Sequence, residues 1–235
     1  WLYPDLLPSR LDLRAWSYVI SPHSRVLEAA ANSLVIAVTV TAVCLLVAVP
    51  AGKGLSELAP RIRRRVEYLF FAPMIIPSLA VALGLHVIFI RAGLADRVVG
   101  VIIAHLLPTV PYMVLVMGST FAHANRELEA QARTLGASPV RAFLLVGLPA
   151  ALPGMITGSL FVFLISWSQY ALTLLIGGGR VLTLPVLLFA FAGAGDLSVT
   201  AALAVVFLLP AVVILAVSSR YLTGRSIALG GVGGR

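Results

Sequence analysis

The chain has 235 residues, of which 60% are hydrophobic and only 11% are charged, and its formal net charge is +8 at pH 7. A soluble domain has about 45–50% apolar and about 25% charged residues, so this composition excludes an ordinary soluble protein and indicates an integral membrane protein. Sixteen of the 17 basic residues are arginines, and almost all lie outside the apolar runs. We therefore attribute the positive charge to membrane topology and expect no nucleic-acid partner.

The first segment, residues 1–30, begins at Trp1 and lacks the layout of a signal peptide. We expect it to lie outside the cell and to follow one further membrane span that precedes Trp1. The single cysteine, Cys44, lies inside the first apolar run. It is interpreted as a small buried residue, because no partner for a disulfide or a metal accompanies it.

Five apolar stretches are long enough to cross a bilayer, which takes about 20 residues of helix. They contain no Asp, Glu, Lys or Arg apart from Glu67 at the edge of the second stretch. The predicted fold class is all-α, a polytopic transmembrane helical bundle, with the expected earlier span making six. The five stretches are residues 33–51, 66–90, 98–118, 154–176 and 198–219.

Basic residues in the connecting loops predict the orientation, because cytoplasmic loops carry an excess of Lys and Arg. Loops 52–65 and 119–153, together with the C-terminal tail, hold eleven of the 17 basic residues, and the opposite side holds six. The side with eleven is predicted to be cytoplasmic.

Prolines interrupt the second and third stretches, at Pro73 and Pro77 and at Pro108 and Pro111. Each proline lacks a backbone donor, and a membrane helix tolerates this only where neighbours or a cavity satisfy the freed carbonyl. Two interpretations remain open: kinked helices that pack well, or broken helices that line a transport pathway.

The loop before the fourth stretch has a structure of its own. Residues 126–135 are strong helix formers, and Gly136 follows where a helix C-terminus favours a residue with positive φ. Ser138 and Pro139 then form a typical start for a second helix, which we expect to end at Pro149. Loops between helices usually take about 2–8 residues, so this helix–turn–helix favours a docking element for a cytoplasmic partner.

Residues 128–149, LEAQARTLGASPVRAFLLVGLP, resemble the EAA loop of the permease subunits of ABC importers. In that motif a glycine follows the glutamate of Glu-Ala-Ala by six residues, and a Leu-Pro ends thirteen residues after the glycine; here Gly136 and Pro149 keep that spacing. The stretches APMIIPSLAVALGL, HLLPTVPYMVLVMGSTFAHANRELE and LLIGGGRVLTLPVLLF are similar to the branch that serves polyamines, thiamine and ferric iron. The resemblance covers about residues 30–220 and implies a MetI-like fold.

The resemblance implies that this loop couples the chain to a cytoplasmic ATPase. One departure is visible: aligned on Gly136, the family's glutamate falls at Ala130, and Glu129 stands one position early, a rotation of about 100° on a helix. We therefore expect Glu129→Ala to matter less than Gly136→Val. The expected coupling residues are Glu129, Ala130, Ala132, Gly136, Ala137, Ser138, Pro139, Arg141 and Pro149.

The chain itself is not expected to be an enzyme, because it has no GxxxxGK[ST] sequence to bind phosphates. The resemblance places ATP and Mg²⁺ on a separate dimer of ATP-binding subunits, and no cofactor in this chain. It further implies a second permease subunit, an external solute-binding protein and a place in the bacterial inner membrane. An ion-coupled secondary transporter or a channel subunit is the alternative.

Candidate pathway residues are the few polar groups inside the apolar stretches. His86 and His105 lie near the proline breaks, and the sequence SWSQY in the fourth stretch supplies Ser166, Ser168, Gln169 and Tyr170. Interhelical hydrogen bonding is the alternative role for each of them. The corresponding place in polyamine permeases resembles Ser-x-Asp-Glu-Phe, and the absence of both carboxylates here weakens a polyamine assignment.

The remaining segments complete the expected organisation. Residues 180–195 are apolar but too short to span, and we expect an external re-entrant helix there. The predicted divisions are an external segment 1–30, a permease domain 31–220 that contains the coupling loop 122–150, and a flexible tail 221–235.

Overall fold

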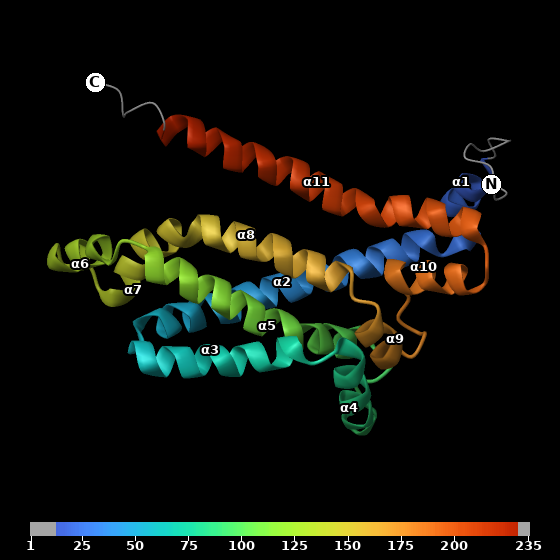
Figure 1. Cartoon of the computed structure of the whole chain (residues 1–235), viewed down its shortest axis with the longest axis horizontal. Coiled ribbons are helices and arrows are strands. Elements are labelled where there is room, and N and C mark those ends of the chain that lie inside the picture. The colour runs from blue at the N-terminus through green and yellow to red at the C-terminus, as the bar shows by residue number, and fades with distance from the viewer. Residues whose placement is uncertain (1–12, 230–235) are drawn as a thin grey trace. The chain divides into compact units, whose positions relative to one another are not determined.

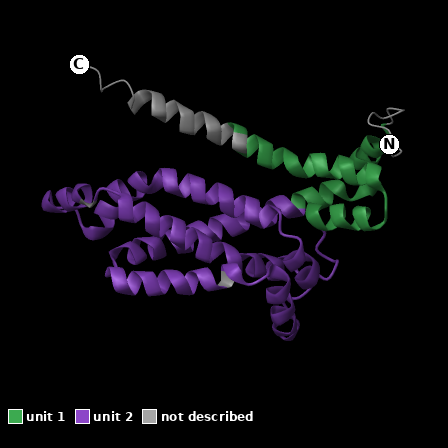
Figure 2. Cartoon of the chain, viewed as in Figure 1, with its two compact units in different colours: residues 1–31, 183–235 green, residues 32–182 purple. Residues whose placement is uncertain are grey.

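The computed structural model describes residues 13–229, which form helices and connecting turns (Figure 1). The chain divides into two compact units, residues 32–182 and residues 1–31 together with 183–235 (Figure 2). The elements in chain order are α1 (Arg14–Ile20), the 3-10 turn η1 (Pro22–Ser24), α2 (Val26–Glu57), α3 (Pro60–Ile75), α4 (Ser78–Arg91), α5 (Val98–His123), α6 (Arg126–Thr134), α7 (Pro139–Ala142), the π-helical segment η2 (Phe143–Gly147), α8 (Leu148–Trp167), α9 (Ala171–Gly177), α10 (Leu184–Gly193) and α11 (Leu197–Leu229).

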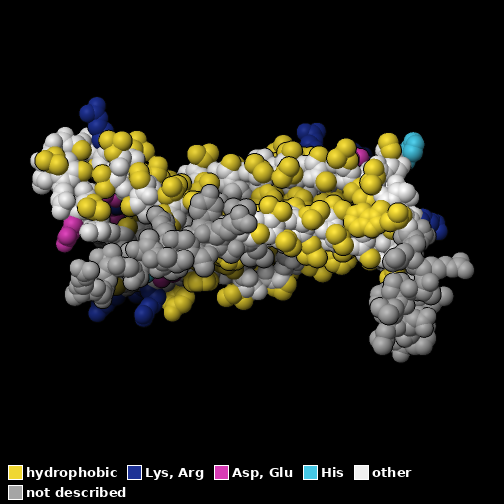
Figure 3. Space-filling model, turned by 90° about the horizontal axis from the view of Figure 1, so that it is seen from above, with side chains coloured by type: hydrophobic (Ala, Val, Ile, Leu, Met, Phe, Trp, Pro, Cys, Tyr) yellow, Lys and Arg dark blue, Asp and Glu magenta, His cyan; other side chains and the backbone are white. Residues whose placement is uncertain are grey.

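The unit of residues 32–182 is built around α5, which packs against α3, α8 and α9. Its core is apolar: Ile36 and Val40 of α2, Met113 and Met117 of α5, and Val162 of α8 are almost completely buried. The outward faces of the same helices are also apolar, with many exposed Leu, Ile and Val side chains. Among the described residues visible in Figure 3, hydrophobic side chains are numerous and charged ones few, as lipid-facing helices require.

Small residues let the helices of this unit approach closely. A Cβ on Gly52 of α2 would collide with Met117 of α5, and a Cβ on Gly158 of α8 would overlap the side chain of Met113. Gly154 and Gly158 form a Gly-xxx-Gly pair, the spacing at which membrane helices often pack backbone to backbone. The glycines therefore fix how near α2 and α8 lie to α5.

Four helical elements within the described residues are long and apolar enough to cross a membrane. They are Val26–Glu57, Val98–His123, Pro139–Trp167 and Leu197–Ile214. They correspond to the first, third, fourth and fifth predicted stretches, and the second stretch is different.

The second predicted stretch, residues 66–90, is not one helix. The chain leaves the helix at Ile76, whose φ and ψ are −73° and 128°, and α4 begins after Pro77. A residue before proline is pushed out of the α region, so Pro77 accounts for the break. Figure 1 shows α4 turning away from the direction of α3. Of the two interpretations, the broken helix therefore holds at Pro77, whereas Pro73 lies inside the continuous helix α3.

The third predicted stretch is continuous, which agrees with the first interpretation of its prolines, a helix that packs well, and not with a broken helix. Pro108 and Pro111 both lie inside α5, which runs without a break from Val98 to His123. The hydroxyl of Thr109 donates to the carbonyl of His105 at 2.6 Å, and neighbouring helices enclose this part of α5. Such support is what allows proline inside a membrane helix.

The fourth predicted stretch, residues 154–176, has its boundaries wrong. The helix begins at Pro139 in the preceding loop and ends at Trp167, and α9 is a separate helix. Ser168 and Gln169 close the end of α8 with backbone hydrogen bonds to Leu164 and Ser166. The span is therefore shifted toward the loop.

The other unit holds α1, η1, the start of α2, α10 and α11. Tyr18 of α1 packs edge-on against Phe191 of α10, with ring centroids 5.4 Å apart, and Asp196 accepts a hydrogen bond from the backbone of Val199 at the start of α11. The short apolar helix expected within 180–195 is present as α10. Helix α11 continues through residues 221–229, which the sequence assigned to a flexible tail; residues 1–12 and 230–235 lie outside the described residues.

Candidate functional site

Helix α6 carries the first half of the predicted docking element. Asn125 precedes the helix, and its side chain accepts a hydrogen bond from the backbone of Glu127 at 2.9 Å. Acidic residues occupy the first turn and Arg133 the last turn, which suits the helix dipole. The helix predicted over residues 126–135 is confirmed and ends one residue earlier.

The turn after α6 depends on Gly136, whose φ is +91°. The backbone of Gly136 donates to Arg133 at 3.0 Å, and that of Ala137 donates to Ala132 at 3.0 Å. These two bonds are the pattern of a Schellman motif, which places a residue with positive φ at the position of Gly136. The predicted left-handed glycine is confirmed.

Helix α7 begins as the sequence predicts. The hydroxyl of Ser138 accepts a hydrogen bond from the backbone of Arg141 at 3.4 Å, and Pro139 occupies the first turn. The predicted end of this helix at Pro149 is wrong. The chain widens into the π-helical segment η2, in which Leu148 donates to Phe143, and continues directly into α8. A wide turn at that point accommodates the proline, because the backbone no longer needs the regular donor that proline lacks.

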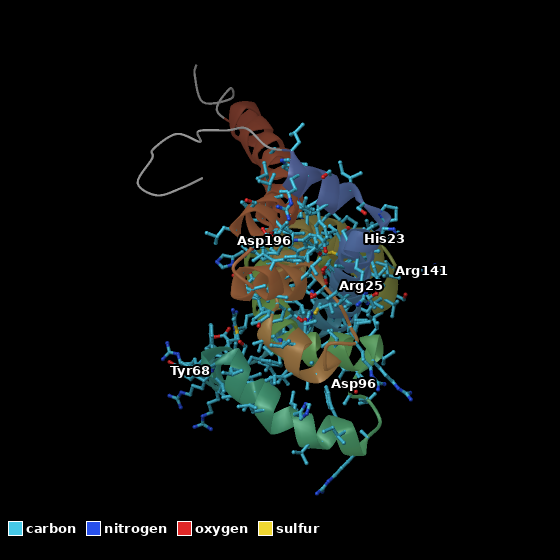
Figure 4. The ribbon with its side chains drawn as sticks, turned by 90° about the vertical axis from the view of Figure 1, so that its right-hand side faces the viewer. His23, Arg25, Tyr68, Asp96, Arg141 and Asp196 are labelled. Atoms are coloured by element: carbon cyan, nitrogen blue, oxygen red, sulfur yellow. The ribbon has the colours of Figure 1, made fainter. Side chains whose placement is uncertain are left out.

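The turn and α7 present an apolar tip. The side chains of Leu135 and Val140 are 88% and 66% exposed, and Arg141, labelled in Figure 4, follows Val140 on α7 and is also exposed. Leu128 of α6 is also exposed. A surface of this kind, apolar with a basic rim, is suited to a groove on another protein.

Glu129 and Ala130 face different surroundings. Ala130 is exposed, whereas Glu129 is turned inward and its carboxylate lies 2.8 and 2.9 Å from Nζ of Lys53 on α2. This pair brings loops 52–65 and 119–153 together at one end of the unit, as the orientation argument requires. Lys53 is the one lysine of the sequence, and it was not among the predicted functional residues. Its position at the edge of an apolar run was the only sequence signal for such a role.

The Lys53–Glu129 pair borders an open pocket of about 380 Å³ between α2, α6 and α7. Both signs of charge line it: Lys53 and Arg133 are basic, and Glu57 and Glu129 are acidic. Pro139 and Phe143 complete the wall on the side of α7 and η2. The pocket therefore lies directly behind the docking element.

His105, a candidate pathway residue, lies at the centre of a buried polar cluster. Its Nδ1 is 2.9 Å from the hydroxyl of Ser166 and its Nε2 is 2.9 Å from the hydroxyl of Thr173. Thr109 bonds back to the His105 carbonyl, and Cys44 donates to Thr109 at 3.3 Å. The cluster joins α2, α5, α8 and α9, which matches the interhelical role that the sequence left open for His105 and Ser166.

The other candidate pathway residues are not gathered into one site. Ser168, Gln169 and Tyr170 form the break between α8 and α9, where Ser168 is exposed. His86 lies on α4, and its Nδ1 is buried without a hydrogen-bond partner among the described residues. None of the six candidates lines the pocket of about 290 Å³ beside the chain break at Pro77, whose wall is formed by Met74, Ile75, Ile76, Pro77, Ser78, Val81, Leu107, Pro108 and Leu172.

A second cluster at the other end of the unit involves the glycine-rich sequence after α9. Asp96, labelled in Figure 4, has a φ of +61°, and its backbone donates to the carbonyl of Ile176 at 2.8 Å. Its carboxylate lies against Gly178, where a side chain would overlap it, and 3.8 Å from Nε of Arg180. The contact fastens the loop before α5 to the loop after α9.

Comparison with known proteins gives a consistent group of relatives. The family model described as binding-protein-dependent transport system inner membrane component matches residues 45–227. The chain is 28% identical over 179 residues to the molybdenum transport system permease protein of Mycobacterium tuberculosis, covering 71% of this chain and 67% of that protein. It is 33% identical over 151 residues to the molybdate/tungstate transport system permease protein of Thermococcus kodakarensis, covering 64% and 61%.

A third relative is the putrescine transport system permease protein of Escherichia coli, 28% identical over 128 residues and covering 52% of this chain and 46% of that protein. The chain thus spans about two thirds or less of the length of these three relatives. Among solved structures, the MetNI methionine ABC transporter in inward-facing conformations matches with a TM-score of 0.68 and 15% identity, over 84% of this chain and 94% of that chain. That likeness supports the fold.

Proposed function

The chain belongs to the family of binding-protein-dependent transport system inner membrane components. We propose that its α6–α7 loop is the docking site through which an ATPase drives transport. The chain is a permease subunit of the ABC importer type, a multi-pass protein of the inner membrane. ATP hydrolysis belongs to a separate subunit in such transporters, and the chain has no phosphate-binding loop of its own. An ion-coupled secondary transporter or a channel does not fit this family.

The observation that carries the proposal is the geometry of the loop. The Schellman turn at Gly136 projects Leu135 and Val140 outward, and the helix after the turn is continuous with α8 through η2. A partner bound to the tip is therefore attached to one end of the helical element Pro139–Trp167. Displacement of the tip is passed into the membrane without a flexible linker.

The proposed assembly contains a dimer of ATP-binding subunits that carries ATP and Mg²⁺, a second permease subunit and an external solute-binding protein. The loops predicted to be cytoplasmic by their basic residues are those at the α6 end of the unit, which supports a docking tip on the side where ATP is available. The polar pathway would form between the two permeases, with Ser168, Gln169 and Tyr170 at the break in reach of a solute and His105 and Ser166 as its inner support.

For the transported solute, we propose a small oxyanion of the molybdate or tungstate kind. Permeases for these oxyanions are among the relatives that cover most of the chain. The SWSQY break, moreover, has Ser168 and Gln169 where polyamine permeases are expected to have carboxylates. A cation such as putrescine would lose its counter-charge there, because an amine in a low-dielectric path needs an opposite charge.

The central test is co-purification and energy dependence. An affinity tag on this chain is expected to recover an ATP-binding subunit from the native host, and uptake is expected to stop when ATP hydrolysis is blocked while the proton gradient persists. Uptake that continues without ATP hydrolysis would contradict the function.

The solute is tested separately, with radiolabelled molybdate and radiolabelled putrescine in the same cells. Uptake of molybdate that is competed by tungstate is expected. Uptake of putrescine alone would contradict the oxyanion assignment and leave the permease function standing.

A further inference from the structure

The Lys53–Glu129 pair links two segments that are 76 residues apart in the chain. Both carboxylate oxygens of Glu129 lie within hydrogen-bond distance of Nζ, and the two side chains are only 21% and 22% exposed. Glu57, one turn further along α2, is 3.6 Å from the same nitrogen, and the ring of Phe121 lies 5.6 Å away. A bidentate, partly enclosed pair of this kind is held much more firmly than an exposed one.

The carboxylate of Glu129 also touches the start of the fourth span. It lies against Gly147 in η2, so closely that a Cβ on this glycine would collide with Oε1. Glu129 thus contacts α2 through Lys53 and the entrance to α8 through Gly147. One side chain of α6 therefore fixes the distance from α6 to two membrane helices.

Lys53 lies in the part of α2 that packs most closely against α5. On one side of it, Gly52 packs against Met117 and the backbone of Gly118; on the other, Leu55 fills the space above Gly118. Neither contact leaves room for an added methyl group. Movement of Lys53 must therefore carry the loop end of α5 with it, because densely packed helices do not deform continuously.

We propose that Lys53 is a positioning residue for transport: its ion pair with Glu129 fastens the docking loop to α2, and through α2 to α5. This inference rests on the proposed function. An ATPase that moves the tip then moves α2 together with α8 and α5, and without the pair the tip loses its direct connection to α2. The pair is internal to this chain, so it acts after docking and does not itself hold the ATPase.

The test uses the assembled transporter in proteoliposomes, with radiolabelled molybdate uptake per ATP hydrolysed as the readout. Lys53→Met is expected to keep the ATPase subunit bound and ATP hydrolysis intact, and Lys53→Met and Glu129→Gln are each expected to lower uptake per ATP about fivefold or more. The double variant is expected to lose no more than either single variant, since both remove the same link. The exchange of charges, Lys53→Glu with Glu129→Lys, is expected to recover a large part of the coupling.

Arg63→Met is the matched control. It removes the ion pair of Arg63 with Glu67, which has similar exposure but lies within α3 and joins nothing else. Unchanged uptake per ATP in this variant would show that loss of an ion pair as such is harmless. An unchanged ratio in Lys53→Met, or losses that multiply in the double variant, would overturn the inference.

A second readout makes the result independent of the solute. Spin labels at Gly54 of α2 and Thr134 of α6, both exposed, report the distance across the link in a Cys44→Ala background. The native pair is expected to keep one narrow distance with and without Mg-ATP and vanadate, and Lys53→Met to broaden and shift it. An identical distribution in both proteins would overturn the inference, whereas failure of the wild type to bind an ATPase would instead contradict the proposed function.

Discussion

The side chain of Thr120 on α5 occupies the space above Gly154 on α8, so that a Cβ on the glycine would overlap its hydroxyl. Thr120 cannot turn aside without cost, because its hydroxyl donates to the carbonyl of Val116 at 2.8 Å. The contact sets how closely α8 runs along α5, the central helix of the unit.

Gly154→Val is therefore expected to lower the stability of the protein by about 1–3 kcal/mol, the usual cost of overpacking. The measurement is the temperature at which the detergent-solubilised protein loses its monodisperse gel-filtration peak. Adding Thr120→Ala should restore part of the loss by making room. Gly84→Val on α4, where no atom lies within 4 Å of the added Cβ, is the control and should change little more than helix propensity requires. Equal losses at both positions would speak against a close α5–α8 contact.

Gly136→Val is expected to uncouple ATP hydrolysis from uptake while the membrane helices stay folded. A β-branched residue is strained at a φ of +91°, and relief of that strain must move the docking tip. Uptake and ATP hydrolysis are measured on the same proteoliposomes. Gly54→Val, at an exposed glycine of α2 that lacks a positive φ, is expected to keep both activities. Full coupled uptake in Gly136→Val would show that the turn conformation is not needed.

Asn125→Ala removes the side chain that caps α6 and is expected to destabilise this helix by about 1 kcal/mol. Hydrogen exchange at the backbone amides of α6 should become faster, whereas α5 should be unaffected. Asn125→Asp keeps an acceptor at the same place and should restore slow exchange. No change in Asn125→Ala would mean that contacts such as Lys53–Glu129 hold α6 without its cap.

His105→Leu leaves the hydroxyl of Ser166 without its buried partner and is expected to cost about 1–2 kcal/mol. The melting temperature should fall, and the relative uptake of different solutes should stay the same, because the imidazole is buried in the helix contacts. A variant with unchanged stability but altered solute preference would instead assign His105 to the pathway.

The docking element could be predicted in detail because its signals are local. Asn125, Gly136, Ser138 and Pro139 each act on the few residues beside them, and these positions are where the structure agrees with the sequence. The predicted end of the second helix at Pro149 is wrong because the wide turn of η2 accommodates the proline. No pattern in the sequence of residues 143–147 predicts a π-helical segment.

Longer-range features could not be predicted in the same way. The break at Ser168–Tyr170 contains neither glycine nor proline, and it arises where α9 packs against α4 and α5. The partner of Glu129 is 76 residues distant in the sequence, and two of the hydroxyls around His105 come from Ser166 and Thr173 on other helices. Such pairings follow from tertiary packing, and a single sequence does not reveal them.

The helical element Pro139–Trp167 has 29 residues and, at about 1.5 Å per residue, transmits a displacement over about 44 Å. Its far end is the break between α8 and α9. The imidazole of His105 hydrogen-bonds on both sides of this break, to Ser166 before it and to Thr173 after it. A relative shift of about 1 Å takes one of these two bonds out of range. Both bonds of His105 can therefore persist only while α8 and α9 keep their spacing. A displacement of α8 relative to α9 would break one of them first.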